Sequence, residues 1–152
     1  MRAGEEVTPA QSLQRSLVSE DMQRQPVVMS GVDEFHRAVL LKSSRQEAGV
    51  TKEQYLTTQL YIAERAMACT EYASRGTQEK VVAVFDFGEA SVGTPPLRWQ
   101  IDTIRILQKL YPERLHKLVV LQPPFLVRNL FKAMKPILSK ATTEKISVAS
   151  DR

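Results

Sequence analysis

The segments VVAVFDFGEAS (residues 81–91), PPLRWQIDTIRILQKLYPERLHKLVVLQPPFL (residues 95–126) and FKAMKPILSKATTEKISV (residues 131–148) decide the fold. They alternate short apolar runs with longer amphipathic ones, and Gly or Pro stands at most of the junctions. This order predicts strand, helix, strand, helix, strand, as in βαβ units with right-handed connections. We therefore expect an α/β protein with a mainly parallel or mixed sheet flanked by helices.

Two strands of this stretch lack the alternation of a half-exposed strand. Residues 81–87 are apolar apart from Asp86, and residues 117–122 form a second apolar run that Pro123 and Pro124 close. Such runs are typical of strands buried on both faces of a parallel sheet. A third, shorter strand is expected at residues 145–149.

Upstream, the sequence predicts one more strand and a long helix. Residues 26–29 form a short strand, after which Gly31 and Asp33 are expected to open a loop that runs to about Val50. A helix then begins at Thr51, which forms a capping box with Gln54, and ends before Gly76. One stripe of this helix is expected to face the sheet: Leu56, Leu60, Ala63, Met67 and Thr70.

Two further helices are expected in the second half of the chain. The first is capped by Thr94, carries Pro95 and Pro96 in its first turn and ends at Pro112. The second spans residues 125–139. It combines a broad apolar face with a basic stripe of Arg128, Lys132 and Lys135. From the residues alone, that combination is more typical of an ordinary amphipathic helix docked on a sheet, and it also suits a helix lying on anionic lipid.

Composition limits the possible functions. The chain has 152 residues, which suggests one domain, and Cys69 is its only cysteine, so it forms no internal disulfide and a cytoplasmic location is expected. Residues 1–100 carry a net charge of −2 and residues 101–152 a net charge of +6. The basic part favours an anionic membrane face or is a solvated surface. No basic run or aromatic pattern indicates nucleic-acid binding.

The string Tyr111-Pro112-Glu113-Arg114-Leu115, followed by VVLQPPF at residues 119–125, resembles the CRAL-TRIO lipid-binding family. The resemblance covers residues 24–149 and is strongest over residues 81–146. It implies a non-enzymatic protein that binds or transfers a phospholipid or another hydrophobic ligand, with a phosphoinositide preferred. It also implies a cytoplasmic protein that associates peripherally with an anionic membrane surface.

The resemblance also implies particular site residues. A lipid headgroup site is expected at Glu113, Arg114, Thr142 and Lys145, where Thr and Lys donate to a phosphate. The helix at residues 125–139 corresponds to the gate over the lipid cavity. Its gate and cavity residues are Phe125, Leu126, Leu130, Phe131 and Met134. Val81 and Ala83 stand where choline-binding members carry hydroxyl residues, which argues against a choline lipid.

Enzyme motifs are lacking. The sequence has no Gly-x-Ser-x-Gly elbow, no phosphate-binding Gly-Lys-Ser/Thr loop and no His-Glu-x-x-His pair. His36 and His116 do not make a metal site, and no cofactor is expected. Asp86 resembles a recurring loop-shaping residue of the family rather than a catalytic carboxylate. The alternative to lipid binding is a protein-interaction or regulatory module with a degenerate lipid cavity, because some related domains occur in GTPase regulators and scaffolds.

The domain organisation is expected to be simple. Residues 1–23 form a mobile N-terminal arm. Residues 24–149 form the lipid-binding domain, which is expected to be incomplete at both ends, because the family usually adds an N-terminal helical lobe and continues past the strand that follows Lys145.

Overall fold

The computed structural model describes residues 27–43, 50–88 and 95–149. Within them the strands are β1 (Val27–Val32), β2 (Ala38–Ser43), β3 (Val81–Asp86), β4 (Leu115–Leu121) and β5 (Ile146–Ala149). The helices are α3 (Lys52–Ser74), α4 (Leu97–Leu110), α5 (Phe125–Met134) and α6 (Lys140–Glu144). The predicted N-terminal arm and the predicted cap at Thr94 lie outside the described residues.

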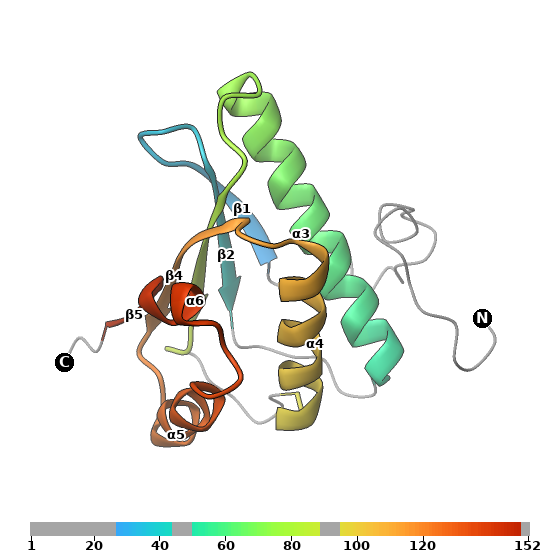
Figure 1. Ribbon diagram of the computed structural model, residues 1–152, viewed down its shortest axis with the longest axis vertical. Helices are drawn as coiled ribbons and strands as arrows, with labels where there is room; N and C mark the ends of the chain where they lie inside the picture. The colour runs from blue at the N-terminus through green and yellow to red at the C-terminus, as the bar shows by residue number, and fades with distance from the viewer. Residues whose placement is uncertain (1–26, 44–49, 89–94, 150–152) are drawn as a thin grey trace.

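The five strands form one sheet in chain order, β1-β2-β3-β4-β5. β1 pairs antiparallel with β2, with a bulge between Met29 and Gly31, and every later neighbour is parallel. Parallel neighbours joined in chain order by right-handed connections carry those connections on one face. In Figure 1, α4 and α6 lie nearer the viewer than β2 and β3. The predicted mixed sheet flanked by helices is therefore confirmed.

The predicted loop at residues 31–50 is wrong in its first half, because β2 lies inside it. The Asp33 carboxylate closes a tight turn: it accepts hydrogen bonds from the Phe35 and Arg37 backbone N–H groups, each at 2.9 Å. His36 takes the left-handed φ of 64° within this turn. The chain thus reverses at once, and residues 38–43 pair with β1 instead of remaining in a loop.

α3 begins as predicted, with Thr51 and Gln54 in a reciprocal capping box. It ends with Arg75 and Gly76 both at positive φ, 53° and 78°. Its predicted stripe is only partly right, since Leu60 and Thr70 are buried while the other three residues are half-buried. α3 packs against both the sheet and α4, so its buried surface is broader than one stripe: Tyr55, Thr57, Thr58, Leu60, Ile62, Ala66, Thr70 and Ser74.

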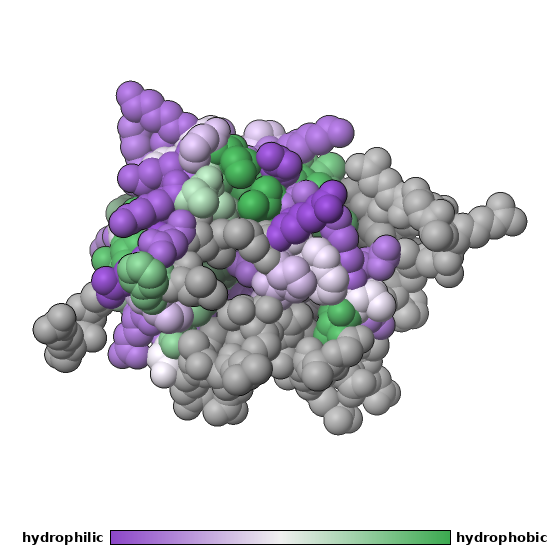
Figure 2. All heavy atoms as spheres, turned by 90° about the horizontal axis from the view of Figure 1, so that it is seen from below, coloured by the Kyte–Doolittle hydropathy of each residue, from purple (hydrophilic) through white to green (hydrophobic). Residues whose placement is uncertain are grey.

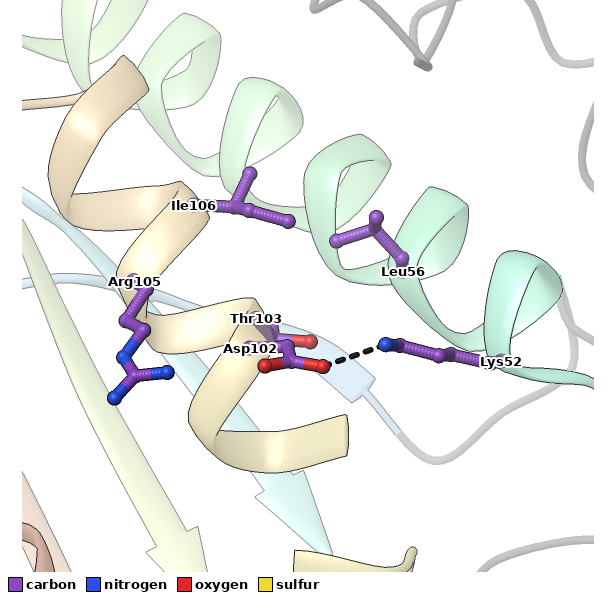
Figure 3. Close-up of a pocket in the computed structure, with 6 residues that line it drawn as sticks. All are labelled: Lys52, Leu56, Asp102, Thr103, Arg105 and Ile106. Carbon is purple, nitrogen blue, oxygen red and sulfur yellow. Dashed lines mark hydrogen bonds and ion pairs between the residues drawn. The ribbon is translucent and has the colours of Figure 1, made fainter. Parts of the chain in front are cut away.

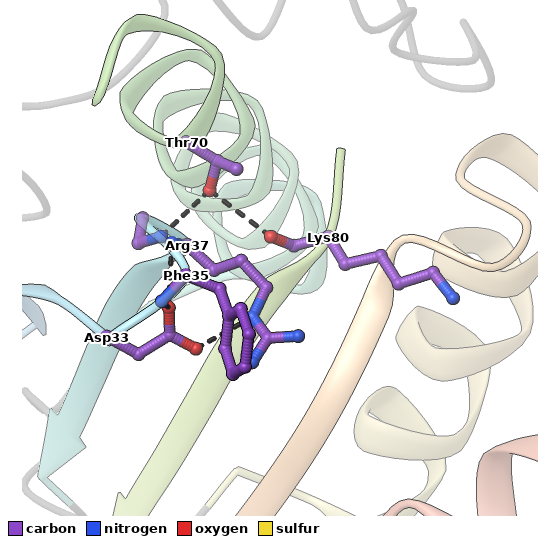
Figure 4. Close-up of polar contacts among 6 residues, drawn as sticks. Asp33, Phe35, Arg37, Thr70 and Lys80 are labelled. Carbon is purple, nitrogen blue, oxygen red and sulfur yellow. Dashed lines mark hydrogen bonds and ion pairs between the residues drawn. The ribbon is translucent and has the colours of Figure 1, made fainter. Parts of the chain in front are cut away.

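The Thr70 hydroxyl ties α3 to the sheet (Figure 4). It accepts a hydrogen bond from the Ala38 backbone N–H at 2.9 Å and donates to the Lys80 carbonyl at 3.3 Å. Ala38 is the first residue of β2, and Lys80 directly precedes β3. One fully buried side chain therefore satisfies the main chain where β2 and β3 begin.

The two faces of the sheet differ in burial. On the α3 face, the buried strand residues are Ala38, Leu40, Ala83 and Val120. On the opposite face, Val39, Leu41, Val82, Val84, Val119 and Leu121 are all half-buried. The expectation that residues 81–87 are buried on both faces is therefore wrong, because only Ala83 among them is buried and the others are half-buried.

The predicted helix over residues 125–139 is shorter in the structure. α5 ends at Met134, two residues before Pro136, which has no N–H to donate and disfavours helical backbone in the residue before it. Ser139 then caps the short helix α6 through a hydrogen bond from the Thr142 N–H at 3.1 Å. α4 also starts later than expected, at Leu97, with Pro96 as its N-cap rather than in its first turn.

Candidate functional site

Glu113 and Lys145, two of the predicted headgroup residues, are in direct contact. Lys145 Nζ donates to Glu113 Oε2 at 2.8 Å, and this hydrogen bond, together with the lysine charge, lowers the pKa of the Glu113 carboxyl. The Glu113 side chain is 64% exposed and that of Lys145 19% exposed. The pair therefore presents an ionised carboxylate to solvent beside a more sheltered ammonium.

The local backbone explains this meeting. Pro112 follows α4, and Glu113 adopts a left-handed φ of 60°, which turns the chain into β4. Lys145 is the C-cap of α6 and directly precedes β5, the parallel neighbour of β4. The Leu118 N–H donates to the Lys145 carbonyl at 2.9 Å, which fixes the start of β5 beside the middle of β4.

The other two predicted headgroup residues point to different partners. Arg114 forms an ion pair with Glu79 at 3.5 Å, in the loop before β3. The Thr142 hydroxyl lies 2.8 Å from the Ser139 hydroxyl and accepts a hydrogen bond from Gln108 of α4 at 3.3 Å. The structure thus brings together two of the four residues, and Thr142 instead links α6 to α4.

The predicted gate residues on α5 divide between the surface and the interior. Phe125 is 77% exposed, Phe131 is half-buried and Met134 is 2% exposed. The side chains of Leu126 and Leu130 lie outside the described part of the structure. Val127, which the sequence interpretation did not single out, is buried at the i, i+7 spacing from Met134, a helical repeat that was available in the sequence.

The three basic side chains of the stripe, Arg128, Lys132 and Lys135, differ in their surroundings. Arg128 Nε donates to the Pro123 carbonyl at 3.1 Å, at the loop that enters the helix. Lys132 and Lys135 are exposed. Figure 2, which views the molecule from below, shows hydrophobic side chains next to strongly hydrophilic ones across the coloured part of this face.

A polar cluster that the sequence interpretation missed lies between β2, β3 and α3. Lys42 Nζ donates to Gln59 Oε1 at 2.9 Å and lies 5.5 Å and 5.6 Å from the ring centroids of Tyr55 and Phe85. The Tyr55 ring in turn packs beside the ring of Trp99 of α4, with 6.1 Å between the two ring centroids. Because residues 31–50 were expected to form a loop, Lys42 could not be placed on a strand facing α3.

A shallow pocket lies between α3 and α4 (Figure 3). Its volume is about 290 Å³, and it is lined by Lys52, Leu56, Asp102, Thr103, Arg105 and Ile106. Lys52 and Asp102 form an ion pair at 2.5 Å across it. None of the predicted gate or headgroup residues lines this pocket, whose volume is at the lower end of the usual range for small-ligand sites.

Asp86 shapes the loop at the end of β3, as expected. Its Oδ1 accepts a hydrogen bond from the Gly88 N–H at 2.8 Å. In the described segments, no group of three or more His, Cys, Asp or Glu side chains is placed to hold a metal ion. No helix among the described residues is long and apolar enough to cross a bilayer.

Comparisons with known proteins agree with this fold. The chain matches the sequence model of the CRAL/TRIO domain over residues 16–152. Its fold is similar to that in the crystal structure of Sfh5, with a TM-score of 0.72 and 16% sequence identity over 92% of this chain and 54% of that chain. The chain thus spans about half the length of Sfh5. No curated protein matches it in sequence.

These findings define the class first: an α/β domain with a mixed five-stranded sheet flanked by helices. The chain belongs to the CRAL/TRIO domain family, since the family model covers most of its length. Lipid binding or transfer is the property that this family shares.

Proposed function

We propose that this chain is a non-enzymatic lipid-binding or lipid-transfer domain, with a phosphoinositide as its preferred ligand. The observation that carries the proposal is the contact of Lys145 with Glu113 at 2.8 Å in a chain of this family. An ammonium beside an ionised carboxylate suits an inositol phosphate, because the lysine donates to phosphate oxygens while the carboxylate accepts from ring hydroxyls.

The acyl chains would lie against apolar surface between α5 and the helix-covered face of the sheet. α5 supports this role through its division into a buried side at Val127 and Met134 and an exposed end at Phe125. We further propose that α5 docks on an anionic membrane surface, with Phe125 at the acyl boundary and Lys132 and Lys135 near the headgroups. On this proposal the protein is cytoplasmic and associates peripherally with the membrane.

The direct test is native mass spectrometry of the purified chain offered phosphatidylinositol, phosphatidylcholine and a neutral diacylglycerol. Retention of one phospholipid per chain, with phosphatidylinositol preferred, supports the proposal. Apo protein alone after all three lipids have been offered contradicts it.

One observation favours a second function, a protein-interaction or regulatory module. The apolar side of α5 is tightly packed, with Val127 at 7% exposure and Met134 at 2%, as in a filled core rather than an open cavity. A chain that retains no lipid but keeps a cooperative unfolding transition supports this alternative.

A further inference from the structure

The pocket between α3 and α4 leaves two aliphatic side chains without full cover. Leu56 of α3 and Ile106 of α4 are both half-buried, and Figure 3 shows them pointing toward one another across the pocket. Leu56 was expected to face the sheet, but it lines this pocket instead. A recess with aliphatic walls receives an apolar side chain, the kind of anchor that supplies much of the binding energy in protein interfaces.

The rim of the pocket, formed by Lys52, Arg98, Asp102 and Arg105, is basic. The hydrogen bond and the charge of Lys52 lower the pKa of the Asp102 carboxyl, and the charges of Arg98 and Arg105 lower it further. Three cations thus surround one carboxylate, which gives the rim a net charge of +2. Glu53, the acidic residue in the first turn of α3, does not line the pocket.

The two arginines of the rim are available to a partner. Arg98 and Arg105 are both exposed, and in the described part of the chain neither forms a direct ion pair. In Figure 3, Arg105 lies on the other side of Asp102 from Lys52. Seven residues separate the two arginines, so they lie on one stripe of α4, about 10 Å apart along its axis. A guanidinium binds a carboxylate through two parallel N–H groups. The spacing therefore matches two carboxylates that lie two turns apart on another helix.

The shape of this surface favours a protein partner over a lipid. A bilayer receives side chains that protrude, as Phe125 does at 77% exposure, whereas a recess receives a side chain that protrudes from its partner. A bound phospholipid does not fit, because pockets for drug-sized ligands already measure about 300–1,000 Å³ and this pocket measures about 290 Å³. A groove between two helices is a common binding place for an amphipathic helix.

We propose that an acidic amphipathic helix of a partner protein docks on the pocket between α3 and α4. Its apolar anchor lies between Leu56 and Ile106, and two of its carboxylates bind the arginines of the rim. The inference does not rest on lipid binding, because none of the predicted headgroup or gate residues lines this pocket. It gives the second candidate function, protein interaction, a surface and a partner chemistry.

The test uses two fluorescein-labelled, helix-forming peptides with leucines at positions i, i+4 and i+7. One peptide carries glutamates at the flanking positions and the other carries lysines. Fluorescence anisotropy should show that the acidic peptide binds at least about tenfold more tightly, and that about 0.5 M salt removes most of this preference. Equal binding of the two peptides, or no binding of the acidic one, overturns the proposal.

A pair of double variants tests the arginines. Arg98→Gln with Arg105→Gln should weaken binding of the acidic peptide about threefold to thirtyfold, the usual range for two exposed ion pairs. The matched control is Lys132→Gln with Lys135→Gln on α5, which changes the net charge equally and should leave peptide binding unchanged. An equal loss in both double variants would show that net charge alone attracts the peptide, and it overturns the assignment.

Two variants test the apolar anchor. Leu56→Phe fills the pocket, and Ile106→Thr keeps a branched side chain but makes one wall polar. Each should weaken binding of the acidic peptide at least about fivefold, and circular dichroism checks that each variant is folded. Full binding by both folded variants overturns the anchor.

The same variants separate this inference from lipid binding. The arginine double variant should retain phosphatidylinositol in native mass spectrometry as the unchanged chain does, so loss of the peptide alone supports the pocket. If this variant instead loses partition onto anionic vesicles as strongly as the control variant on α5, the rim is a membrane surface and the proposal fails. A chain that binds the acidic peptide but retains no phospholipid contradicts the proposed lipid function and leaves the docking pocket intact.

Discussion

The Lys145 ammonium and the Glu113 carboxylate meet at 2.8 Å although 32 residues separate them in the sequence. Glu113 lies in the turn between α4 and β4, and Lys145 lies between α6 and β5. Their contact therefore depends on the parallel pairing of β4 with β5. The pair is also accessible, since Glu113 is 64% exposed. A solvent-exposed ion pair contributes little to stability, so ligand binding can depend on this pair without folding depending on it.

Replacing Lys145 with Ala should therefore weaken phosphatidylinositol binding and leave the melting temperature nearly unchanged. Loss of a hydrogen bond to a charged phosphate costs ~1.5–3 kcal/mol, or about a tenfold to hundredfold loss of affinity. A fluorescent-lipid displacement assay measures the change. Binding of a neutral lipid serves as the control, and an equal loss for both lipids would mean that Lys145 acts through folding.

Neutralising Lys132 and Lys135 together should weaken association with anionic vesicles. Each lysine near such a surface contributes about 1 kcal/mol, so Lys132→Gln with Lys135→Gln should lower the partition coefficient about thirtyfold. The effect should shrink at 0.5 M salt, because salt screens exposed charges. Sedimentation with vesicles of known anionic lipid content measures the partition.

A matched control for this experiment lies elsewhere on the same molecule. Lys109 of α4 and Lys117 of β4 are also exposed, and replacing both with Gln changes the net charge by the same amount. An equal loss of partition in this control variant would show that net charge, rather than α5, drives membrane association.

Lys42 should make the free energy of unfolding depend on pH in alkaline solution. Burial lowers its pKa to about 8 from the ordinary 10.5, so between these values the unfolded chain binds more protons than the folded one. Stability therefore rises with pH in this window, by up to about 2 kcal/mol between pH 7.5 and 9.5. Urea unfolding at several pH values measures the rise.

The control for the pH experiment is Lys42→Met, in which this rise should be absent. Tyr55 and Tyr111 act in the opposite direction above pH 10, since burial raises the pKa of both hydroxyls and the Glu64 carboxylate raises that of Tyr111 further. Measurements should therefore stop at pH 9.5. A rise of equal size in the Lys42→Met chain would contradict the assignment.

Removing the Thr70 hydroxyl should destabilise the fold without touching either proposed ligand site. Thr70→Val leaves the Ala38 N–H and the Lys80 carbonyl without their shared partner, which costs about 1–3 kcal/mol each time a buried group is left unsatisfied. Chemical denaturation measures the loss. Thr70→Ser keeps the hydroxyl and should recover most of the stability, an outcome that a purely steric role of Thr70 does not predict.

The order of strands and helices after residue 50, apart from the short helix α6, could be predicted because most junctions carry a local signal. Pro112, Pro123 and the Thr51–Gln54 capping box act within a few residues, so their effects are readable in sequence. β2 was missed because the Asp33 carboxylate forms its hydrogen bonds with main-chain groups, and this turn cannot be told from a loop by hydrophobic pattern alone.

The candidate site was less predictable than the fold. Glu113 and Lys145 were expected from a family resemblance, whereas their distance depends on strand pairing between segments far apart in sequence. Arg114 could reach either neighbouring loop, and only the structure shows that it contacts Glu79. The partnership of Lys42 and Gln59 depends on the rotation of α3 over β2, which no local pattern specifies.

The bulge between Met29 and Gly31 affects whether a strand from another molecule can pair with this edge of the sheet. β1 is an edge of the five-stranded sheet, and a long flat edge would be a template for a strand from another molecule. A bulge interrupts the regular spacing of N–H and C=O groups and increases the local twist, so an incoming strand can match only a few residues at a time. At the opposite edge β5 has four residues. The two edge strands thus resist pairing with another molecule by different means, since β1 is irregular and β5 is short.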